Sequence, residues 1–427
     1  MAARIDEASA GTHHYGVTPT PTPDDVLPRP MGTVHVIGAG PVGLFFAALM
    51  QSLPQQPVRI YERRPEYTRS RMVTLAPYLV ADSIETYQAD VLDGPNVAAL
   101  FSPDELETRL AYRRTVAPDL KALIQAWTVG FASINDIEMT LRRLIEDRGT
   151  GTVERIETTA TREDILASLG PHDVIVDCSG TRSLFRDALV PGGDAADHPN
   201  LMRVRLEYAL VVTFLYSEHY ECDEYCKYYK NAGNTAYKFI PGVHRTYYDG
   251  SISHVTGIIT ITKDEFDAMP GQFDGSWLRE HFPAVAESMD RFMNRVRDDT
   301  HGEVVGEEEI VRIPLDVYHA RNFTSRPWRR SAEPGPLSTT AAFVLGDSAI
   351  GSPYFGSISL GFECAFFLAG HLANRQLPMG EIFDRYEAFM DKQFLRVYMR
   401  TTLIKHNKDL LELIDDRFAL LSRLHIY

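Results

Sequence analysis

The stretch GTVHVIGAGPVGLFFAALMQSLPQQPVRIYERR, residues 32–64, decides the fold of this 427-residue chain. A β-branched run enters a glycine-rich turn, an apolar helix follows, and a second strand, residues 58–61, ends at Glu62. Strand, glycine turn, helix, strand and acid in this order are typical of a dinucleotide-binding βαβ unit. We expect Glu62 to accept hydrogen bonds from the adenosine ribose, and we include Arg63 among the cofactor-binding residues. The motif does not separate FAD from NAD, and a tight βα turn without a ligand is the alternative.

Each glycine of this turn has a separate expected task. Gly38 permits the tight turn, Gly40 lets a pyrophosphate approach the backbone, and Gly43 lets helix and strand pack closely. The helix that begins near Pro41 and Val42 offers free N–H groups and a partial positive charge to the phosphates. The turn therefore predicts a phosphate cradle.

Composition excludes several classes of protein. The chain has 44% apolar and 24% charged residues, as ordinary globular proteins do, and a formal charge of −15. That charge argues against nucleic acid or an anionic membrane as the main partner. We find no secretion signal and no run of roughly 18 apolar residues that would span a membrane. Four cysteines in so long a chain form no disulfide framework, so we expect a reduced, cytoplasmic protein.

A second motif, TAAFVLGDSAIGSPYFGSISLGFECAFFLAGHLANR, lies at residues 340–375. An apolar strand ends in Gly346 and Asp347, and a loop with Pro353 and Gly356 leads into a long apolar helix. This pattern resembles the second flavin motif of the class A FAD monooxygenases, the fold shared by aromatic-ring hydroxylases. The resemblance implies that Asp347 binds the ribityl chain and that the loop passes close to the isoalloxazine ring. An aspartate that merely caps a helix is the alternative.

The third stretch, VIVDCSGTRSLFRDAL at residues 174–189, resembles the turn before the substrate domain in the same family. Gly180, Ser183 and Arg186 occupy the family's glycine, serine and arginine positions, which places Gly180 and Arg186 in the cofactor site. The family's aspartate is replaced by Ser179. In the family that acid helps hold a turn serving both FAD and the reduced nicotinamide, so the change weakens the case for NAD(P)H more than the case for FAD.

Two further segments, residues 64–84 and 131–147, resemble the MICAL-type branch of the family. The resemblance implies an FAD contact from Arg71, with Arg69 as the alternative, although either arginine could be a solvated surface charge. It implies a second contact from Asn135 at a helix start, where Asn135 could equally be the helix cap.

The predicted fold class is α/β: a discontinuous Rossmann-type FAD-binding domain, an inserted antiparallel β substrate domain, and C-terminal helices. The expected order is a flexible tail over 1–31, FAD-binding parts over 32–200 and 335–380, a substrate domain over 201–334, and helices over 381–427.

The substrate domain is predicted from β-branched and aromatic runs around a hairpin turn at Asp249 and Gly250. Its aromatic residues could line a substrate pocket, although core packing is their commoner use; they include Tyr216, Tyr237, Phe239, Tyr247 and Tyr248. The stretch YECDEYCKYY lacks the spacing of a zinc site, and we expect no metal.

The resemblance implies an FAD-dependent monooxygenase of specialised metabolism, with no catalytic side chain assigned. Its substrate would be a small to medium organic molecule, hydroxylated or epoxidised with molecular oxygen through a flavin C4a-hydroperoxide, with NAD(P)H as the electron donor. Two alternatives remain open. One is a redox-silent FAD-dependent cyclase of the same fold acting on a polyketide-type substrate, and the other is a non-catalytic, FAD-containing interaction module.

Overall fold

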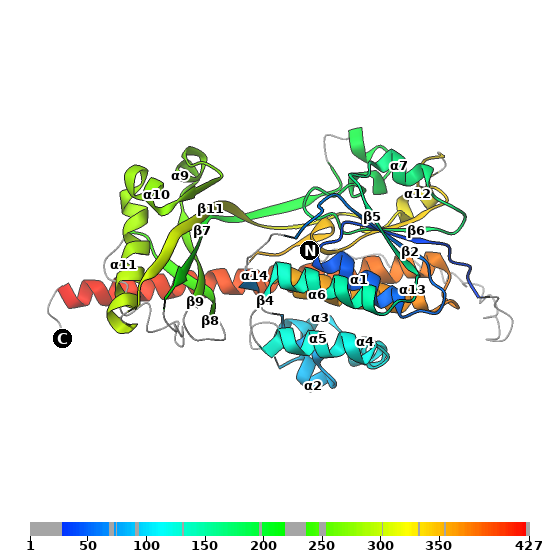
Figure 1. The fold of residues 1–427 in the computed structure, drawn as a ribbon, viewed down its shortest axis with the longest axis horizontal. Helices are drawn as coiled ribbons and strands as arrows, with labels where there is room; N and C mark the ends of the chain where they lie inside the picture. Colours follow the sequence, from blue (N-terminus) through cyan, green and yellow to red (C-terminus); the bar gives the residue numbers. More distant parts are fainter. Residues whose placement is uncertain are drawn as a thin grey trace, which may run out of the picture.

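The computed structural model describes residues 28–67, 72–73, 75–89, 94–129, 132–195, 199–217, 236–246, 253–300, 302–331, 334–353 and 356–423. Two lobes are joined by a pair of long strands, and one long helix extends from the first lobe toward the far end of the second (Figure 1). We call them the parallel-sheet lobe and the antiparallel-sheet lobe.

The parallel-sheet lobe is built on five parallel strands in the order β12-β6-β1-β2-β5. Their bounds are β1 Val34–Ile37, β2 Val58–Glu62, β5 Val153–Glu157, β6 Val174–Asp177 and β12 Ala341–Val344. Three of these strands, β1, β6 and the edge strand β12, are buried along their whole length, as expected for apolar strands covered on both faces. The order places β1 at the centre, beside β6, which leads into the third motif, and β12, which leads into the second motif, lies on the far side of β6.

Helices cover both faces of this sheet. On one face α1 (Pro41–Gln51) packs between α6 (Ile134–Asp147) and α13 (Ser357–Ala373), and α7 (Arg162–Ala167) and α12 (Arg326–Arg330) lie on the other (Figure 1). The small residues of α1 and α13 let the two helices approach closely. Phe45 stacks on Phe362 with ring centroids 3.9 Å apart.

A helical segment connects β3 (Met72–Val73) to β4 (Ala132–Ser133), which pair with each other. It consists of the 3₁₀ turn η1 Pro77–Val80 and the helices α2 Ile84–Tyr87, α3 Gly94–Leu100, α4 Pro103–Arg114 and α5 Pro118–Val129. The segment packs on α13 and on α14 (Met379–Arg423). The C-terminal helical region is thus a single 45-residue helix over the described residues.

The antiparallel-sheet lobe has the strand order β10-β11-β7-β9-β8. The bounds are β7 Met202–Tyr216, β8 Phe239–Thr246, β9 Ser253–Ile261, β10 Gln272–Asp274 and β11 Val304–His319, with α9 Lys263–Ala268, α10 Gly275–His281 and α11 Pro283–Thr300 between them. Side chains from alternate positions of β7, β9 and β11 form a separate core with α10 and α11. Tyr216 and Phe239 belong to this core, whereas Tyr237 bonds Glu265 at its margin.

The chain returns to the first lobe through β11. Val317, Ala320 and Phe323 are buried in the core of the parallel-sheet lobe, and β11 pairs with β13 (Ile350–Gly351), which lies within the second motif. The 3₁₀ turns η2 (Asp187–Leu189), η3 (Gly193–Ala195) and η4 (Gly346–Ser348) complete the described elements. The predicted fold class, a discontinuous Rossmann-type lobe with an inserted antiparallel sheet and a helical C-terminal region, is confirmed.

Several predictions fall outside the described residues: most of the tail, Arg69, Arg71, the stretch YECDEYCKYY, Tyr247, Tyr248 and the turn at Asp249. Among the described helices, none combines the length and the apolar character that crossing a membrane requires.

Candidate cofactor-binding site

All three sequence motifs meet at one edge of the parallel sheet, where the carboxyl ends of the strands lie. Gly38 follows β1, Glu62 ends β2, Asp177 ends β6 and Gly346 follows β12. In open α/β sheets, ligands bind at this edge, where helices lead away to opposite faces. Segments more than 300 residues apart in the sequence therefore form one candidate site.

The glycine turn has the geometry that only glycine allows. Gly38 has φ +95°, and a Cβ on it would lie 2.8 Å from the carbonyl oxygen of Cys178. A Cβ on Gly43 would lie 2.0 Å from the carbonyl oxygen of Gly38. Gly40 takes an extended conformation as the N-cap of α1, directly before Pro41 at its first position. The close packing of helix and strand that the sequence suggested is thus present.

The second motif packs directly on the first. Gly346 has φ +65°, and its α-carbon faces Val42, whose Cγ1 would be 3.2 Å from an added Cβ. An added Cβ on Gly361 of α13 would lie 2.4 Å from Cγ2 of the same valine. Val42 of the first motif therefore packs against both Gly346 and Gly361 of the second motif, and a side chain at Gly361 would require Val42 to shift.

The N-termini of α1 and α13 differ from most others in the chain. Six described helices have a Ser, Thr or Asp side chain that accepts from a first-turn N–H: α2, α4, α6, α7, α9 and α10. No side-chain cap hydrogen bond and no first-turn acid is present in α1, α13 or the short α12. Uncapped N–H groups at an N-terminus are suited to an anionic ligand such as a pyrophosphate.

Glu62 is buried at the end of β2 and is fully engaged. Its Oε2 accepts from Ala39 N at 2.9 Å, and its Oε1 accepts from Arg64 N at 2.9 Å and Arg64 Nε at 3.1 Å. Burial raises the pKa of Glu62, but hydrogen bonds and charge from Arg64 and the bond from Ala39 outweigh it, so the net shift is downward. The carboxylate is therefore held ionised, as a ribose acceptor must be.

The arginine that pairs with this carboxylate is Arg64, not the adjacent Arg63, whose side chain is exposed. Arg64 also lies 3.6 Å from buried Glu138 of α6, measured from Nη2 to Oε1. A ribose at Glu62 would take the place of the Arg64 side chain, and Glu138 offers that arginine a second carboxylate. No pattern in the sequence distinguishes Arg63 from Arg64 as the partner of Glu62.

The turn after β6 is organised by a residue that sequence reasoning missed. Asp177 is fully buried, and its Oδ1 accepts from Ser179 N at 2.8 Å and Ser179 Oγ at 2.5 Å. Its Oδ2 accepts from Ser183 Oγ at 2.6 Å and Phe185 N at 2.7 Å. Ser179 Oγ in turn accepts from Leu184 N at 3.1 Å. An acid at the end of a fully apolar strand was the signal that could have identified Asp177.

Ser348 and Arg186 connect this turn to the second motif. Gly180 N donates to Ser348 Oγ at 2.9 Å, and Ser348 Oγ lies 3.4 Å from Asp177 Oδ1. The buried guanidinium of Arg186 donates to the carbonyl oxygens of Ser348 at 3.5 Å and Thr181 at 3.2 Å. Arg186 thus bridges the turns after β6 and β12, and its Nε has no partner among the described residues.

The antiparallel-sheet lobe reaches the same edge through Tyr318 of β11. The Tyr318 hydroxyl donates to the carbonyl oxygen of Asp347 at 2.8 Å, and a Cβ on Gly351 would collide with its ring. Burial and the charge of Asp347 raise the pKa of Tyr318, so the phenol stays protonated and able to donate. This bond fixes the second lobe to the Gly-Asp motif.

Other predicted residues have definite positions without a tested role. Asn135 is half-buried in the first turn of α6, where Ser133 is the cap and accepts from Asp136 N at 3.0 Å; the reading of Asn135 as the cap is therefore wrong. Pro353 and Gly356 flank two residues that are outside the described part, and Gly356 is the N-cap of α13.

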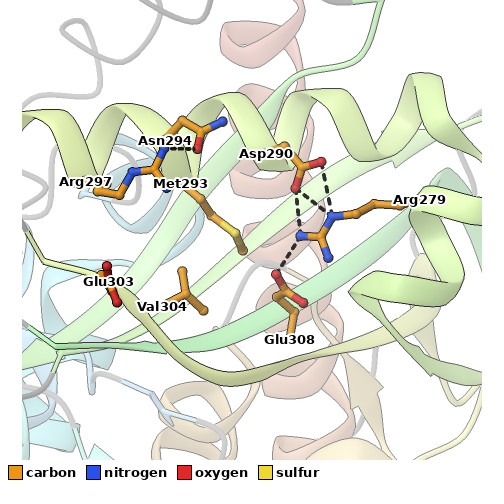
Figure 2. A pocket seen from close by; sticks show the side chains of 8 residues that line it. All are labelled: Arg279, Asp290, Met293, Asn294, Arg297, Glu303, Val304 and Glu308. Carbon is orange, nitrogen blue, oxygen red and sulfur yellow. Dashed lines mark hydrogen bonds and ion pairs between the residues drawn. The ribbon is translucent and has the colours of Figure 1, made fainter.

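A cavity is present elsewhere, between α10, α11 and β11 in the antiparallel-sheet lobe (Figure 2). Its volume is about 440 Å³, and its central cation, Arg279, pairs with Asp290 at 2.7 Å and Glu308 at 2.7 Å. Arg279 is thus paired with two carboxylates of the cavity wall. No group of three metal-ligating side chains occurs among the described residues.

No family model and no curated protein matches the chain. Solved structures that are similar include the aromatic hydroxylase CabE from angucycline biosynthesis, with 15% identity and a TM-score of 0.48 over 92% of this chain and 73% of that one. The Diels-Alderase PyrE3 of the pyrroindomycin pathway has 15% identity and a TM-score of 0.46 over 92% and 78%. The anhydrotetracycline hydroxylase OxyS of Streptomyces rimosus has 16% identity and a TM-score of 0.47 over 91% and 72%. At these identities and scores the likeness assigns no activity to this chain.

Proposed function

We propose that the chain is an FAD-dependent monooxygenase acting on a small to medium organic molecule. The observation that carries the proposal is the convergence of two uncapped helix N-termini, a buried ionised Glu62 and the Gly346-Asp347 turn at one sheet edge. This set of groups fits FAD: two helix N-termini for anionic parts of the cofactor, and one acid for each of its two polyol segments.

We assign each part of the cofactor to specific residues of the chain. Backbone N–H groups at the start of α1 bind the pyrophosphate, and Glu62 accepts from the adenosine ribose after Arg64 moves aside. Asp347 is proposed to accept from the ribityl hydroxyls. The start of α13 supplies positive potential near the flavin ring. Bound FAD supplies the oxygen chemistry, so no nucleophilic side chain is required.

The substrate assignment rests on the lobe that meets this edge. The edge is joined to the antiparallel sheet by the β11–β13 pairing and by the bond from Tyr318 to Asp347. A substrate held by that sheet would therefore be positioned relative to the flavin by a hydrogen-bonded connection. The Asp177 turn is fully bonded with serine at position 179, so the absence of the family's acid there leaves the turn intact.

The test is anaerobic mixing of the purified, FAD-loaded protein with NADPH or NADH, with flavin absorbance followed in the presence and absence of candidate polycyclic aromatic substrates. We expect substrate-stimulated bleaching and, on admission of oxygen, a product heavier by one oxygen atom. Product formation under anaerobic conditions with the flavin oxidised throughout would replace the monooxygenase by a redox-silent cyclase. A protein that cannot be loaded with FAD would refute the whole proposal.

A further inference from the structure

A second charged cluster lies within the helical segment, away from the Gly38 turn. Glu363 of α13 is 1% exposed; it accepts from the Tyr87 hydroxyl with an O···O distance of 2.5 Å and pairs with Arg113 of α4. Arg109 Nη1 lies 3.7 Å from the same carboxylate, and Arg396 Nη1 of α14 lies 3.4 Å from the Tyr87 oxygen. Helices α2, α4, α13 and α14 thus contribute polar or charged side chains to one buried cluster.

Two arginines of this cluster share one carboxylate. Arg109 and Arg113 are 8% and 5% exposed, and both contact Glu363. Among the described residues, Nε and Nη1 of Arg109 and Nε of Arg113 have no hydrogen-bond partner. Guanidinium groups removed from water require an opposing charge and acceptors for their N–H groups. The cluster therefore has an unmet demand for an anion.

The pKa of the Tyr87 phenol is consistent with an excess of positive charge around it. Burial raises the pKa of Tyr87, yet the three arginines outweigh it and the net shift is downward. Another acid of α4, Glu105, pairs with Lys392 at 2.6 Å at the surface.

A cavity of about 180 Å³ opens at this point and includes Arg113 in its wall. Most of the wall is apolar, with Leu110, Ile124 and Phe366 among the contributors. The other cations in the wall are Arg114, which pairs with Glu107 at 2.7 Å, and Lys121, whose Nζ donates to the Arg114 carbonyl oxygen at 2.8 Å. Lys121 has no ion pair with a carboxylate among the described residues, and Asp82 is the acid of the wall.

We propose that this cavity binds a small organic carboxylate, its apolar body against Leu110, Ile124 and Phe366 and its carboxylate between Arg113 and Lys121. A mostly apolar wall with a few convergent cations is the usual design of a site for such a ligand. The volume corresponds to roughly six water molecules in the liquid, which fits a short fatty acid or a single-ring aromatic acid. The proposal is independent of FAD and of the reaction assigned to the cofactor edge.

The test titrates the full-length protein with hexanoate and with benzoate by calorimetry, with 1-hexanol as the uncharged probe. Lys121→Gln removes a cation from the cavity wall without entering the buried cluster. Lys263→Gln is the matched control, because Lys263 is an exposed lysine of α9 paired with Asp267. We expect saturable carboxylate binding that is at least tenfold weaker in Lys121→Gln and unchanged in Lys263→Gln.

Three results would overturn the proposal: absence of saturable binding by either acid, hexanol binding as tightly as hexanoate, or equal weakening by the two lysine variants. Equal stability of both variants to urea, measured in parallel, shows that any loss of binding in Lys121→Gln is local.

Discussion

Ser179→Asp introduces the acid that the family resemblance led us to expect at this position, and the structure predicts that it destabilises the protein. From the sequence alone the change looks harmless to cofactor binding. In the structure Ser179 Oγ lies 2.5 Å from Oδ1 of fully buried Asp177 and donates to it. An aspartate at 179 places a second carboxylate against the first, in a turn whose remaining donors are already used.

The magnitude follows from the two ways the pair can respond. Two unit charges about 3.5 Å apart repel by roughly 5 kcal/mol at an effective dielectric constant near 20. Keeping one carboxyl protonated at pH 7 costs about 4 kcal/mol, from about three pH units at about 1.4 kcal/mol each. The second route is lower in free energy, so we expect a loss of about 4 kcal/mol, a large share of the roughly 5–15 kcal/mol that holds a typical domain folded.

The pH dependence identifies the cause. The folded variant holds one proton more than the unfolded chain between the ordinary carboxyl pKa and the raised pKa of the pair. Its free energy of unfolding should therefore rise as pH falls from 7 toward 4, by up to about 1.4 kcal/mol per unit relative to the wild type.

Urea unfolding at several pH values, with Ser179→Asn as the uncharged control of similar size, measures both effects. A Ser179→Asp protein within about 1 kcal/mol of Ser179→Asn at every pH would refute the reasoning, because that difference is smaller than either electrostatic route allows.

Three further predictions concern the cofactor edge. Glu62→Ala and Asp347→Ala should each weaken FAD binding about ten- to hundredfold in a fluorescence titration, through loss of charge-assisted hydrogen bonds worth roughly 1.5–3 kcal/mol; unchanged affinity in both would show that the acids are structural only. Gly43→Ala should abolish FAD binding and lower the midpoint of thermal unfolding, because the alanine Cβ would lie 2.0 Å from the Gly38 carbonyl oxygen. A Gly43→Ala variant that binds FAD normally would contradict the packing described. The pKa of Glu62 is lowered in the folded state, so its ionised form stabilises the fold above the ordinary glutamate pKa, and this contribution is lost as pH falls through the lowered pKa. Between pH 5 and 3 the free energy of unfolding should therefore fall more in the wild type than in Glu62→Gln. Parallel curves of unfolding free energy against pH for the two proteins would contradict this prediction.

Local patterns predicted the parts of the site that depend on local structure. The positive φ of Gly38 and the contact between Gly43 and the Gly38 carbonyl are consequences of a strand–turn–helix unit, which the spacing of glycines encodes. The choice between Arg63 and Arg64 was not predictable, since it depends on which side chain faces Glu62 once β2 has ended.

Contacts between distant segments account for what the sequence did not reveal. Asp177 was overlooked because its acceptor role depends on a turn that folds back over six to eight residues. Arg113 and Glu363 are 250 residues apart, and nothing in either helix alone indicates their pairing. The helical segment was not recognised as a unit for the same reason: its apolar faces are completed by α13 and α14.

The strands β7 and β11 pair from the antiparallel-sheet lobe toward the core of the other lobe, as Figure 1 shows, with register shifts between Val305 and Glu309 and between Leu315 and Asp316. Strand β11 ends in its pairing with β13. For protein engineering this means that the inserted lobe is not a detachable module. Excising residues 202–319 would remove Tyr318 and leave β13 without its partner strand. A chimera that exchanges this lobe to change substrate range must therefore keep β11 in phase up to His319, since a one-residue slip would turn Tyr318 to the opposite face of the sheet.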